Sequence, residues 1–435
     1  MYLPSHVLFC IEELEKAGYP TYAVGGCVRD ACLGLTPHDY DLCTAATPDT
    51  VAAIFSHRTL VRAGEKHGTI GVVFDGEVIE ITTFRTEGGY EDSRHPQWVA
   101  FVPNVEQDLA RRDFTVNAMA YSPTRGFADP FGGQEDLKNR ILRAVGDPTL
   151  RFTEDALRIL RGVRFAARFG LTPEPDTLQA MKTLSGLMDN LARERVYDEL
   201  SKLLLCARAG DLTTFAPILA TAIPELAPTI DFDQRSTHHA YDVFTHTAYV
   251  VEGVPSVLPL RWAALLHDIG KPQTFSLDEN GQGHFYGHAE ISAEMADAIL
   301  RRLKAPTELR ENAAFLIEKH MTPLAPDKKL LRRRLSQSGQ YRLQMLLQLQ
   351  KADFFAKGVT GDTADFAAVE GILEEIFSEN ACLSIKDLAV NGRDLMALGY
   401  TGPAIGQALQ YLLDQVLEDR LPNEKDALIN ALHKR

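Results

Sequence analysis

The chain has 435 residues, of which 45% are hydrophobic and 24% are charged, and its net charge is −14 at pH 7. These proportions indicate a folded protein of several domains and exclude a predominantly disordered chain. The chain has no apolar run of the roughly 20 residues that a transmembrane helix needs, and its first residues lack signal-peptide character. Six cysteines show no zinc-finger or redox spacing, so we expect a cytoplasmic protein with no membrane partner.

The first part of the chain alternates short strand patterns with a helical one. Asp75-Gly76 separates two runs rich in β-branched residues, which is a strong β-hairpin pattern. We expect one helix and four strands in this part, at residues 7–16, 22–24, 39–44, 69–74 and 78–84. After residue 135 the strand pattern fades, and helical periodicity continues nearly to the end.

Proline-rich breaks divide the helical part. We therefore expect a head, a neck, a body and a tail, at residues 1–135, 136–225, 226–370 and 371–435. The predicted fold class is α+β, with one small mixed sheet in the head and helices elsewhere.

A glycine pair and an acidic pair mark a first candidate site. The pair Gly25-Gly26 ends a strand and opens a helix, so the backbone N–H groups of this turn can approach a phosphate closely. Arg29 can bind the same phosphate. Asp39 and Asp41 alternate along the expected strand 39–44 and so share one face. Two close carboxylates favour a bound Mg²⁺ ion, which suits transfer of a nucleotidyl group. Glu80 is either a third ligand of this metal or a solvent-facing strand residue.

Two further segments supply candidate nucleotide-binding residues. In the first, Arg112 and Asn117 can hold a triphosphate and ribose hydroxyls, and Asp113 can accept a hydrogen bond from a 2′-hydroxyl.

The second segment, residues 152–169, is expected to form one helix on which Asp155 and Arg158 lie side by side. A carboxylate beside a guanidinium matches the donor–acceptor edge of cytosine and of adenine, but not of uracil or guanine. Further along the helix, Arg161 is assigned to base or phosphate. Arg164 and Arg168 contact RNA or fix the helix through acidic neighbours.

These motifs resemble, in the same order, those of the DNA polymerase β nucleotidyltransferase superfamily. The closest resemblance is to class II tRNA nucleotidyltransferases (CCA-adding enzymes) and bacterial poly(A) polymerases. It includes a flexible-loop motif at 90–96 and a neck motif at 192–196. The resemblance implies a polymerase-β-like head that uses CTP, ATP and Mg²⁺ to add CCA to the 3′ end of tRNA.

A second constellation lies in the body. His246, then His267-Asp268, then Asp353 resemble the metal ligands of the HD phosphohydrolase superfamily, and His288 and His320 match the extra histidines of its two-metal members. Imidazole and carboxylate ligands favour a divalent transition metal. Lys271 can steady a phosphate. The resemblance implies phosphatase or 2′,3′-cyclic phosphodiesterase activity.

Three alternatives remain open from the sequence. A poly(A) polymerase and an A-adding tRNA nucleotidyltransferase share nearly all of the head motifs. A protein of another class, an HD phosphohydrolase whose head only binds nucleotide, would not need the acidic pair Asp39 and Asp41.

Overall fold

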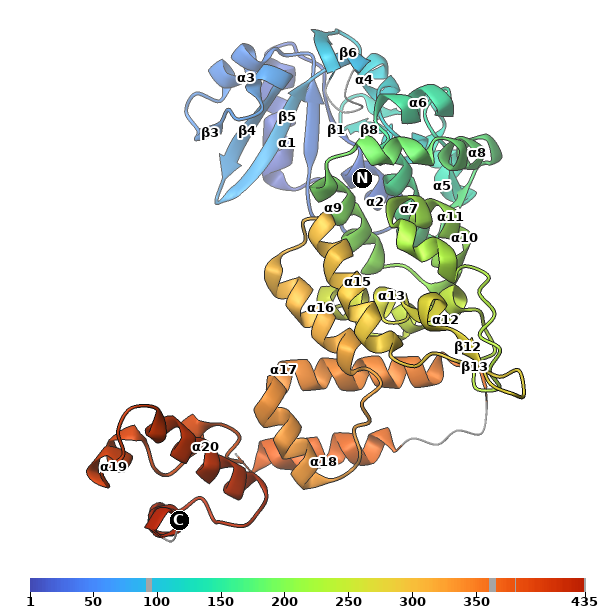
Figure 1. The fold of residues 1–435 in the computed structure, drawn as a ribbon. Coiled ribbons are helices and arrows are strands. Elements are labelled where there is room, and N and C mark those ends of the chain that lie inside the picture. Colours follow the sequence, from blue (N-terminus) through green and yellow to red (C-terminus); the bar gives the residue numbers. More distant parts are fainter. Residues whose placement is uncertain (91–95, 360–364, 380, 434–435) are drawn as a thin grey trace. The chain divides into compact units, whose positions relative to one another are not determined.

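The computed structural model describes residues 1–90, 96–359, 365–379 and 381–433 (Figure 1). It divides into two compact units. The first comprises Met1–Ala227 with Arg302–Lys304, and the second comprises Pro228–Arg301 with Ala305–Arg435.

The first unit is built on a mixed seven-stranded sheet with strand order β3-β4-β5-β2-β1-β8-β9. Its strands are β1 (Thr21–Val24), β2 (Asp41–Thr44), β3 (Leu60–Val61), β4 (Thr69–Phe74), β5 (Glu77–Thr83), β8 (Ala120–Ser122) and β9 (Gly126–Ala128). Within this sheet β2 and β5 pair in parallel, and the other neighbouring strands are antiparallel. The predicted hairpin is confirmed as β4–β5, and its turn residues Asp75 and Gly76 both adopt positive φ angles.

Helices cover the sheet and continue beyond it. The predicted first helix is α1, which buries Val7, Cys10, Ile11 and Leu14, the spacing of one helical face. The helices of this unit are α1 (Ser5–Lys16), α2 (Gly26–Cys32), α3 (Pro48–Ile54), α4 (Val105–Ala110), α5 (Gly133–Lys138), α6 (Pro148–Glu154), α7 (Leu157–Phe169), α8 (Pro175–Thr183), α9 (Arg193–Leu204), α10 (Ala209–Thr214) and α11 (Ala216–Ala222), with 3₁₀ turns η1 (Glu65–His67), η2 (Thr115–Asn117), η3 (Ser185–Asn190) and η4 (Pro224–Thr229). A two-stranded parallel pair, β10 (Ile141–Leu142) and β11 (Thr172–Pro173), lies among them.

Two predicted elements differ in the structure, and a further ribbon was not predicted. Strand β2 begins at Asp41, so Asp39 precedes the strand. The predicted helix 152–169 is two helices, because Asp155 is extended (φ −144°, ψ 102°) between α6 and α7. A ribbon that the sequence analysis missed, β6 (Arg85–Tyr90) with β7 (Pro96–Phe101), flanks the expected flexible loop at 90–96, whose residues 91–95 lie outside the described residues.

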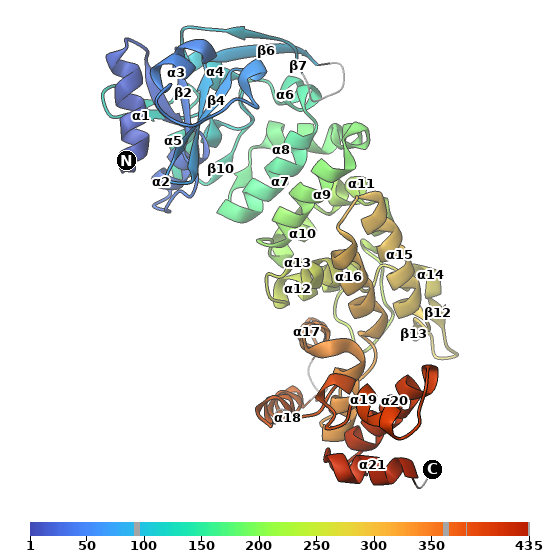
Figure 2. The ribbon, with the colours of Figure 1, turned by 90° about the vertical axis from the view of Figure 1, so that its left-hand side faces the viewer.

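The second unit is helical apart from a short hairpin, β12 (Ser276–Leu277) with β13 (Gly283–His284). Its helices are α12 (Val243–Gly253), α13 (Leu258–Leu266), α14 (Lys271–Thr274), α15 (His288–Arg302), α16 (Thr307–Lys319), α17 (Lys328–Phe355), α18 (Phe366–Ser378), α19 (Gly392–Ala397), α20 (Pro403–Leu417) and α21 (Lys425–His433), with the 3₁₀ turn η5 (Ile385–Asp387). Helix α13 contacts α12, α16 and α17, and the turned view shows this group of helices side by side (Figure 2).

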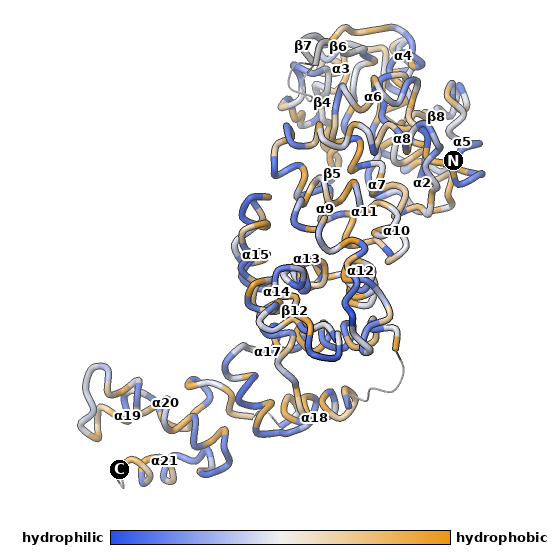
Figure 3. Tube along the Cα trace, turned by 45° about the vertical axis from the view of Figure 1, so that its right-hand side comes forward, coloured by the Kyte–Doolittle hydropathy of each residue, from blue (hydrophilic) through white to orange (hydrophobic). Residues whose placement is uncertain are grey.

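Hydrophobic and hydrophilic residues alternate along most helices (Figure 3). In the described part of the chain, no helix combines the length and the apolar character needed to cross a bilayer. The last helices have a core of their own, formed by residues such as Leu395, Leu412 and Leu428.

Candidate active site and metal centre

The three acidic residues of the first candidate site, Asp39, Asp41 and Glu80, lie where β2 begins beside β5. Leu42 pairs with Ile81 on the parallel neighbour, and both side chains are fully buried. Asp41 and Glu80 each precede one of these residues, so they lie together on the opposite face of the sheet. Asp39, Asp41 and Glu80 line one hollow of about 460 Å³. The structure thus brings Glu80 to the acidic pair.

The surroundings of Asp41 favour a cation. Desolvation by the protein raises the pKa of Asp41, and the carboxylates of Glu80 and Asp39 add to this, while Arg112 works against it. A divalent cation between these groups would relieve their repulsion. The donors are all carboxylate oxygens, which is the ligand set that Mg²⁺ prefers.

A second hollow of about 430 Å³ shares Asp41 with the first. Its lining contains eight arginines and three aspartates, an excess of positive charge suited to a triphosphate. The charged residues are Arg29, Arg111, Arg112, Arg158, Arg161, Arg164, Arg168, Arg195, Asp41, Asp113 and Asp155. Gly25, Gly26 and Asn117 line the same hollow. The structure therefore brings every predicted nucleotide-binding residue to one place.

Glycine is required at the turn into α2. Gly25 has a φ angle of 75°, and a Cβ atom there would lie 2.8 Å from Nη1 of Arg112. A side chain at this position would displace the arginine that faces the hollow. Nε of Arg112 is buried and has no hydrogen-bond partner among the described residues, so it is available to a ligand.

A buried network joins four of the predicted residues. Arg29 donates to Oδ1 of Asn117 at 2.5 Å, and Nδ2 of Asn117 donates to Oδ1 of Asp113 at 2.9 Å. Arg161 donates to Oδ2 of Asp113 at 2.8 Å, and the N–H of Phe114 donates to Oδ1 at 2.8 Å. These partners occupy both oxygens of Asp113. The structure therefore assigns Asp113 to positioning Arg161 and Asn117, and the predicted hydrogen bond from a ribose hydroxyl is not what its geometry favours.

The predicted base-reading pair is arranged differently from the sequence expectation. Asp155 and Arg158 are not side by side on one helix, because the chain breaks at Asp155. Asp155 pairs with Arg195 (3.0 Å), whereas Arg158 pairs with Glu154 (2.7 Å). Both side chains still line the hollow. Arg195 is a site residue that the sequence analysis quoted only within the neck motif.

Arg164 has a structural partner. Its Nε donates to Oε2 of Glu199 at 2.6 Å, and both side chains are more than 90% buried. This pair ties α7 to α9. Of the two interpretations left open for Arg164, the structure favours fixing the helix through an acidic neighbour over contacting RNA.

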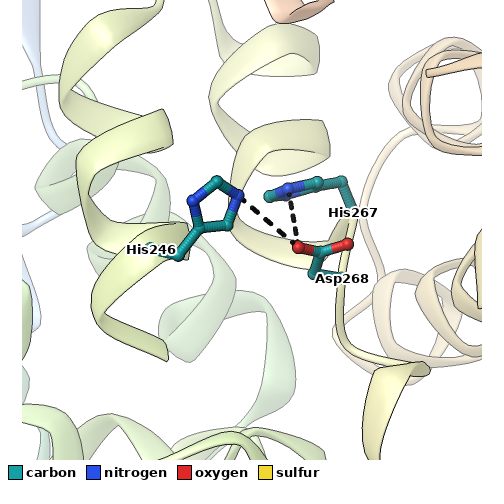
Figure 4. A group of neighbouring side chains, drawn as sticks. All are labelled: His246, His267 and Asp268. Atoms are coloured by element: carbon teal, nitrogen blue, oxygen red, sulfur yellow. Dashed lines mark ion pairs between the residues drawn. The ribbon is translucent and has the colours of Figure 1, made fainter. Parts of the chain in front are cut away.

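The second unit brings together all six residues predicted to bind a metal. Nε2 of His246 lies 2.9 Å from Oδ1 of Asp353 and 3.6 Å from Oδ2 of Asp268. Nε2 of His267 lies 3.2 Å from the same Asp268 oxygen. His246 lies on α12, His267 ends α13 and Asp268 follows it (Figure 4), and Asp353 lies on α17.

The other Asp268 oxygen faces a second pair of histidines. Oδ1 lies 3.4 Å from Nε2 of His288 and 3.9 Å from Nε2 of His320. The two histidine nitrogens are 3.3 Å apart. Ligand atoms of His246, His267 and Asp268, and separately of Asp268, His288 and His320, lie within 4.8 Å of one another. Asp268 therefore belongs to both groups of side chains that could each hold a metal ion.

The histidines are held by backbone carbonyls. Nδ1 of each of the four lies within 3.2 Å of a carbonyl oxygen, from Ala356, Ala264, Phe285 and Ile317 in turn. A proton on Nδ1 leaves the lone pair of Nε2 directed at Asp268, which is the usual arrangement of metal-binding histidines. Nε2 of His267 and both oxygens of Asp268 are buried and lack hydrogen-bond partners of normal geometry among the described residues. The donor set fits a divalent transition metal.

The carboxylates of this cluster favour positively charged groups beside them. Burial works against a charged His267, but the carboxylates of Asp268 and Asp353 outweigh it and raise the pKa of His267 to about 10. Lys271 lies 2.8 Å from Oδ2 of Asp268. Burial lowers the pKa of His320 to about 4, which keeps this ring neutral as a ligand must be.

The cluster opens into a hollow of about 400 Å³. Besides predicted residues, its lining contains His239, His284 and Tyr286, which the sequence analysis did not single out. Burial and the nearby Lys271 lower the pKa of His239 to about 3. The adjacent histidines in Ser236-Thr237-His238-His239 were a visible signal that the sequence analysis did not use.

Comparison with known proteins finds nucleotidyltransferase families in separate parts of the chain. Three family models match the chain: the poly A polymerase head domain over residues 21–143, a probable RNA- and SrmB-binding site of polymerase A over residues 170–212, and a putative tRNA nucleotidyltransferase domain 2 over residues 283–432.

Relatives match over nearly the whole chain. A CCA-adding enzyme of Limosilactobacillus fermentum is 34% identical, with 97% of this chain and 94% of the relative covered. A CCA-adding enzyme of Bacillus pumilus is 32% identical, with 98% and 95% covered. The crystal structure of the Bacillus stearothermophilus CCA-adding enzyme in complex with CTP has a TM-score of 0.77 and 29% identity, with 100% of this chain and 98% of that chain covered.

Proposed function

The chain belongs to the family of CCA-adding enzymes, and from this membership we propose that it adds C, C and A in turn to the 3′ end of tRNA, with CTP and ATP as substrates. The observation that carries the proposal is the position of Asp41. It lines both the hollow of the carboxylates and the arginine-lined hollow, so a nucleotide bound there would present its α-phosphate to the acidic residues.

The reaction is a displacement at phosphorus. The terminal ribose hydroxyl of the tRNA attacks the α-phosphorus of the nucleotide, a new phosphodiester bond forms, and the bond to the bridging oxygen breaks to release pyrophosphate. Asp39, Asp41 and Glu80 would hold Mg²⁺, which lowers the pKa of the attacking hydroxyl and neutralises the phosphates. The triphosphate is bound by Gly26, Arg29 and Arg112. Asn117 orients the ribose, and Asp113 holds the Asn117 side chain in place.

Choice of base requires the side chains of Asp155 and Arg158 to reach the base although each already has an ion-pair partner. Each is ion-paired at the edge of the hollow, Asp155 with Arg195 and Arg158 with Glu154. A cytosine or adenine edge would compete for these groups. We propose that Arg195 holds the Asp155 carboxylate in an orientation that accepts the exocyclic amine, while Arg158 donates to the ring nitrogen.

A gel assay with three tRNA transcripts tests this function. The transcripts end before CCA, after C and after CC, and each receives CTP, ATP or both with Mg²⁺. Completion of all three with a stop after A is the expected result. Extension of only the CC-ended transcript would mean an A-adding enzyme, and long A tails would mean a poly(A) polymerase. Failure of all three would leave a nucleotide-binding head on a phosphohydrolase.

We further propose that the cluster in the second unit is a divalent transition-metal site that hydrolyses phosphate esters, including 2′,3′-cyclic phosphates. His246, His267, Asp268 and Asp353 would hold one metal, and Asp268, His288 and His320 a second. A metal held by these residues would supply an acidified water as nucleophile. Lys271 binds the phosphate oxygens, and the buried walls orient the ester.

Metal content distinguishes this proposal from an inert histidine cluster. We expect two bound transition-metal ions per chain by elemental analysis, one in His288→Ala, and none in Asp268→Asn. His433→Ala, an exposed histidine in α21, is the matched control. Equal metal content in wild-type protein and Asp268→Asn would refute the site.

Two broader assignments complete the proposal. The division into head (1–135), neck (136–225), body (226–370) and tail (371–435) stays a proposal, and the compact units, which divide at residues 227/228, support the boundary between neck and body. A cytoplasmic location is supported by the tRNA substrate.

A further inference from the structure

Two large exposed side chains stand at the mouth of the hollow above the histidine cluster. Tyr286 is 78% exposed and Met321 is 58% exposed, and both line the same hollow as Asp268, His288 and His320. Exposed aromatic and thioether groups around a polar pocket are typical of ligand-binding sites. The nucleotidyl-transfer function does not use them.

Tyr286 is held in place by its neighbours. Its ring stacks on that of His284, with ring centroids 5.3 Å apart and planes 9° apart. His284 is in turn fixed by Asp278, with Nε2 of the histidine 3.1 Å from Oδ2 of the aspartate. Because His284 lies against one face of the tyrosine ring, the high exposure of Tyr286 leaves its other face open.

The hairpin that carries His284 and precedes Tyr286 is anchored to the floor of the hollow. A Cβ atom on Gly283 would lie 2.2 Å from the carbonyl oxygen of Gln234, so β13 rests directly on the backbone of Gln234. The side-chain oxygen of Gln234 accepts a hydrogen bond from Lys271 at 2.8 Å. The rim and the phosphate-binding lysine are therefore joined through one residue.

Charge and aromatic surface are separated within the hollow. The floor offers Lys271 and the Asp268 cluster, and the rim offers a flat ring with one open face. A ligand that satisfies both ends has a phosphate at one end and a planar aromatic group at the other. A nucleoside phosphate has this shape, and a volume of about 400 Å³ lies within the usual range for ligand pockets.

We propose that Tyr286, supported by His284, is a stacking platform for a nucleobase, so that this hollow takes nucleoside phosphates in preference to other phosphate esters. The inference rests on the proposed hydrolytic function of the site and adds the residue that sets its specificity. The ligand is a free nucleotide or the last nucleotide of an RNA chain, which present the same base and phosphate.

Equilibrium binding to the full-length, metal-loaded protein tests the proposal. The probes are hydrolysis-resistant phosphonate analogues, named here by their parent compounds: adenosine 3′-monophosphate, ribose 5-phosphate as a ligand without a base, and a short oligoribonucleotide that ends in a 3′-phosphate. Stacking of a base on an aromatic side chain contributes enough that its removal weakens binding roughly 10-fold or more. We expect Tyr286→Ala to weaken the adenosine probe by about that factor and to leave ribose 5-phosphate unchanged.

Three controls assign the effect. Tyr286→Phe keeps the ring and should retain wild-type affinity. Tyr341→Ala removes another exposed tyrosine that does not line this hollow, and should change nothing. Asp268→Asn should lose the part of the binding that belongs to the hollow. If Tyr286→Ala lowers the affinity for the free nucleotide and for the oligonucleotide equally, the platform binds the last base alone. If Tyr286→Ala lowers only the affinity for the oligonucleotide, the ligand of the platform is an RNA chain and not a free nucleotide.

The outcomes separate the two proposals. If both ribose 5-phosphate and the adenosine probe bind but Tyr286→Ala weakens neither, the platform is refuted and the hydrolytic site stands. If no phosphate compound binds with any divalent metal, the hydrolytic function is refuted and the platform with it.

Discussion

Replacing Asp113 with asparagine tests how the nucleotide hollow is held together. The carboxylate is 7% exposed and accepts hydrogen bonds from Arg161, from Asn117 and from the N–H of Phe114. Asparagine has nearly the same shape but removes the charge. Arg161, whose side chain is 36% exposed, then keeps its positive charge with no carboxylate beside it.

The magnitude follows from the pKa of Asp113. Burial works to raise this pKa, but Arg161 and Asn117 outweigh burial and lower it from 3.8 to about 2. That difference, 3.8 minus 2, corresponds to about 2.5 kcal/mol of unfolding free energy at about 1.4 kcal/mol per pKa unit. Because the folded-state pKa is depressed, the contribution is fully present above pH 3.8 and is lost as the pH falls towards 2.

Urea unfolding at several pH values is the assay. We expect the unfolding free energy of Asp113→Asn to be about 2.5 kcal/mol lower than that of the wild-type protein at pH 7. We expect this difference to narrow by about 1 kcal/mol between about pH 5 and pH 3. The KM values for CTP and ATP should rise roughly tenfold, since Arg161 and Asn117 lose their support. Asp75→Asn, in the exposed β4–β5 turn, is the control. Equal stability of wild-type protein and Asp113→Asn at pH 7, with no change of the gap at low pH, would refute the reasoning.

Three further predictions concern other parts of the molecule. Asp41→Ala should abolish nucleotide addition and leave phosphate-ester hydrolysis unchanged; loss of both activities together would contradict two separate sites. Asp155→Ala should lower discrimination against UTP and GTP roughly 10- to 100-fold, measured as ratios of kcat/KM, and unchanged ratios would remove Asp155 from base reading. Glu199→Ala should cost about 3–5 kcal/mol in urea unfolding, because it leaves Arg164 buried and unpaired, and a second change, Arg164→Met, should recover part of that loss.

Local chemistry in the head was predictable where it depended on neighbours in the sequence. The hairpin at Asp75-Gly76 follows from its turn residues. Asp39 and Asp41 line one hollow as expected, although Asp39 precedes β2 and the two do not alternate along one strand. The break at Asp155 was not predictable, because Asp155 caps Leu157 and pairs with Arg195, which lies 40 positions away. For the same reason, the partners of Asp113 and Arg164 became visible only in three dimensions.

The cluster in the second unit shows the opposite case. The resemblance to the HD phosphohydrolase superfamily, carried by the order of residues from His246 to Asp353, predicted the set of side chains that the structure brings together. The platform residues could not be found in that way. Tyr286 is one of 13 tyrosines, and only its stacking on His284 and its place at the rim distinguish it.

The sharing of Asp268 has a consequence for how this centre changes in evolution. One carboxylate serves both histidine pairs, so a single codon change at this position would disable the entire centre at once. Neither histidine pair would then be maintained by selection for metal binding, and the four histidines would be free to mutate. Across the family, the histidine pairs should therefore be inherited together or be missing together, and chains that keep only one pair should be rare.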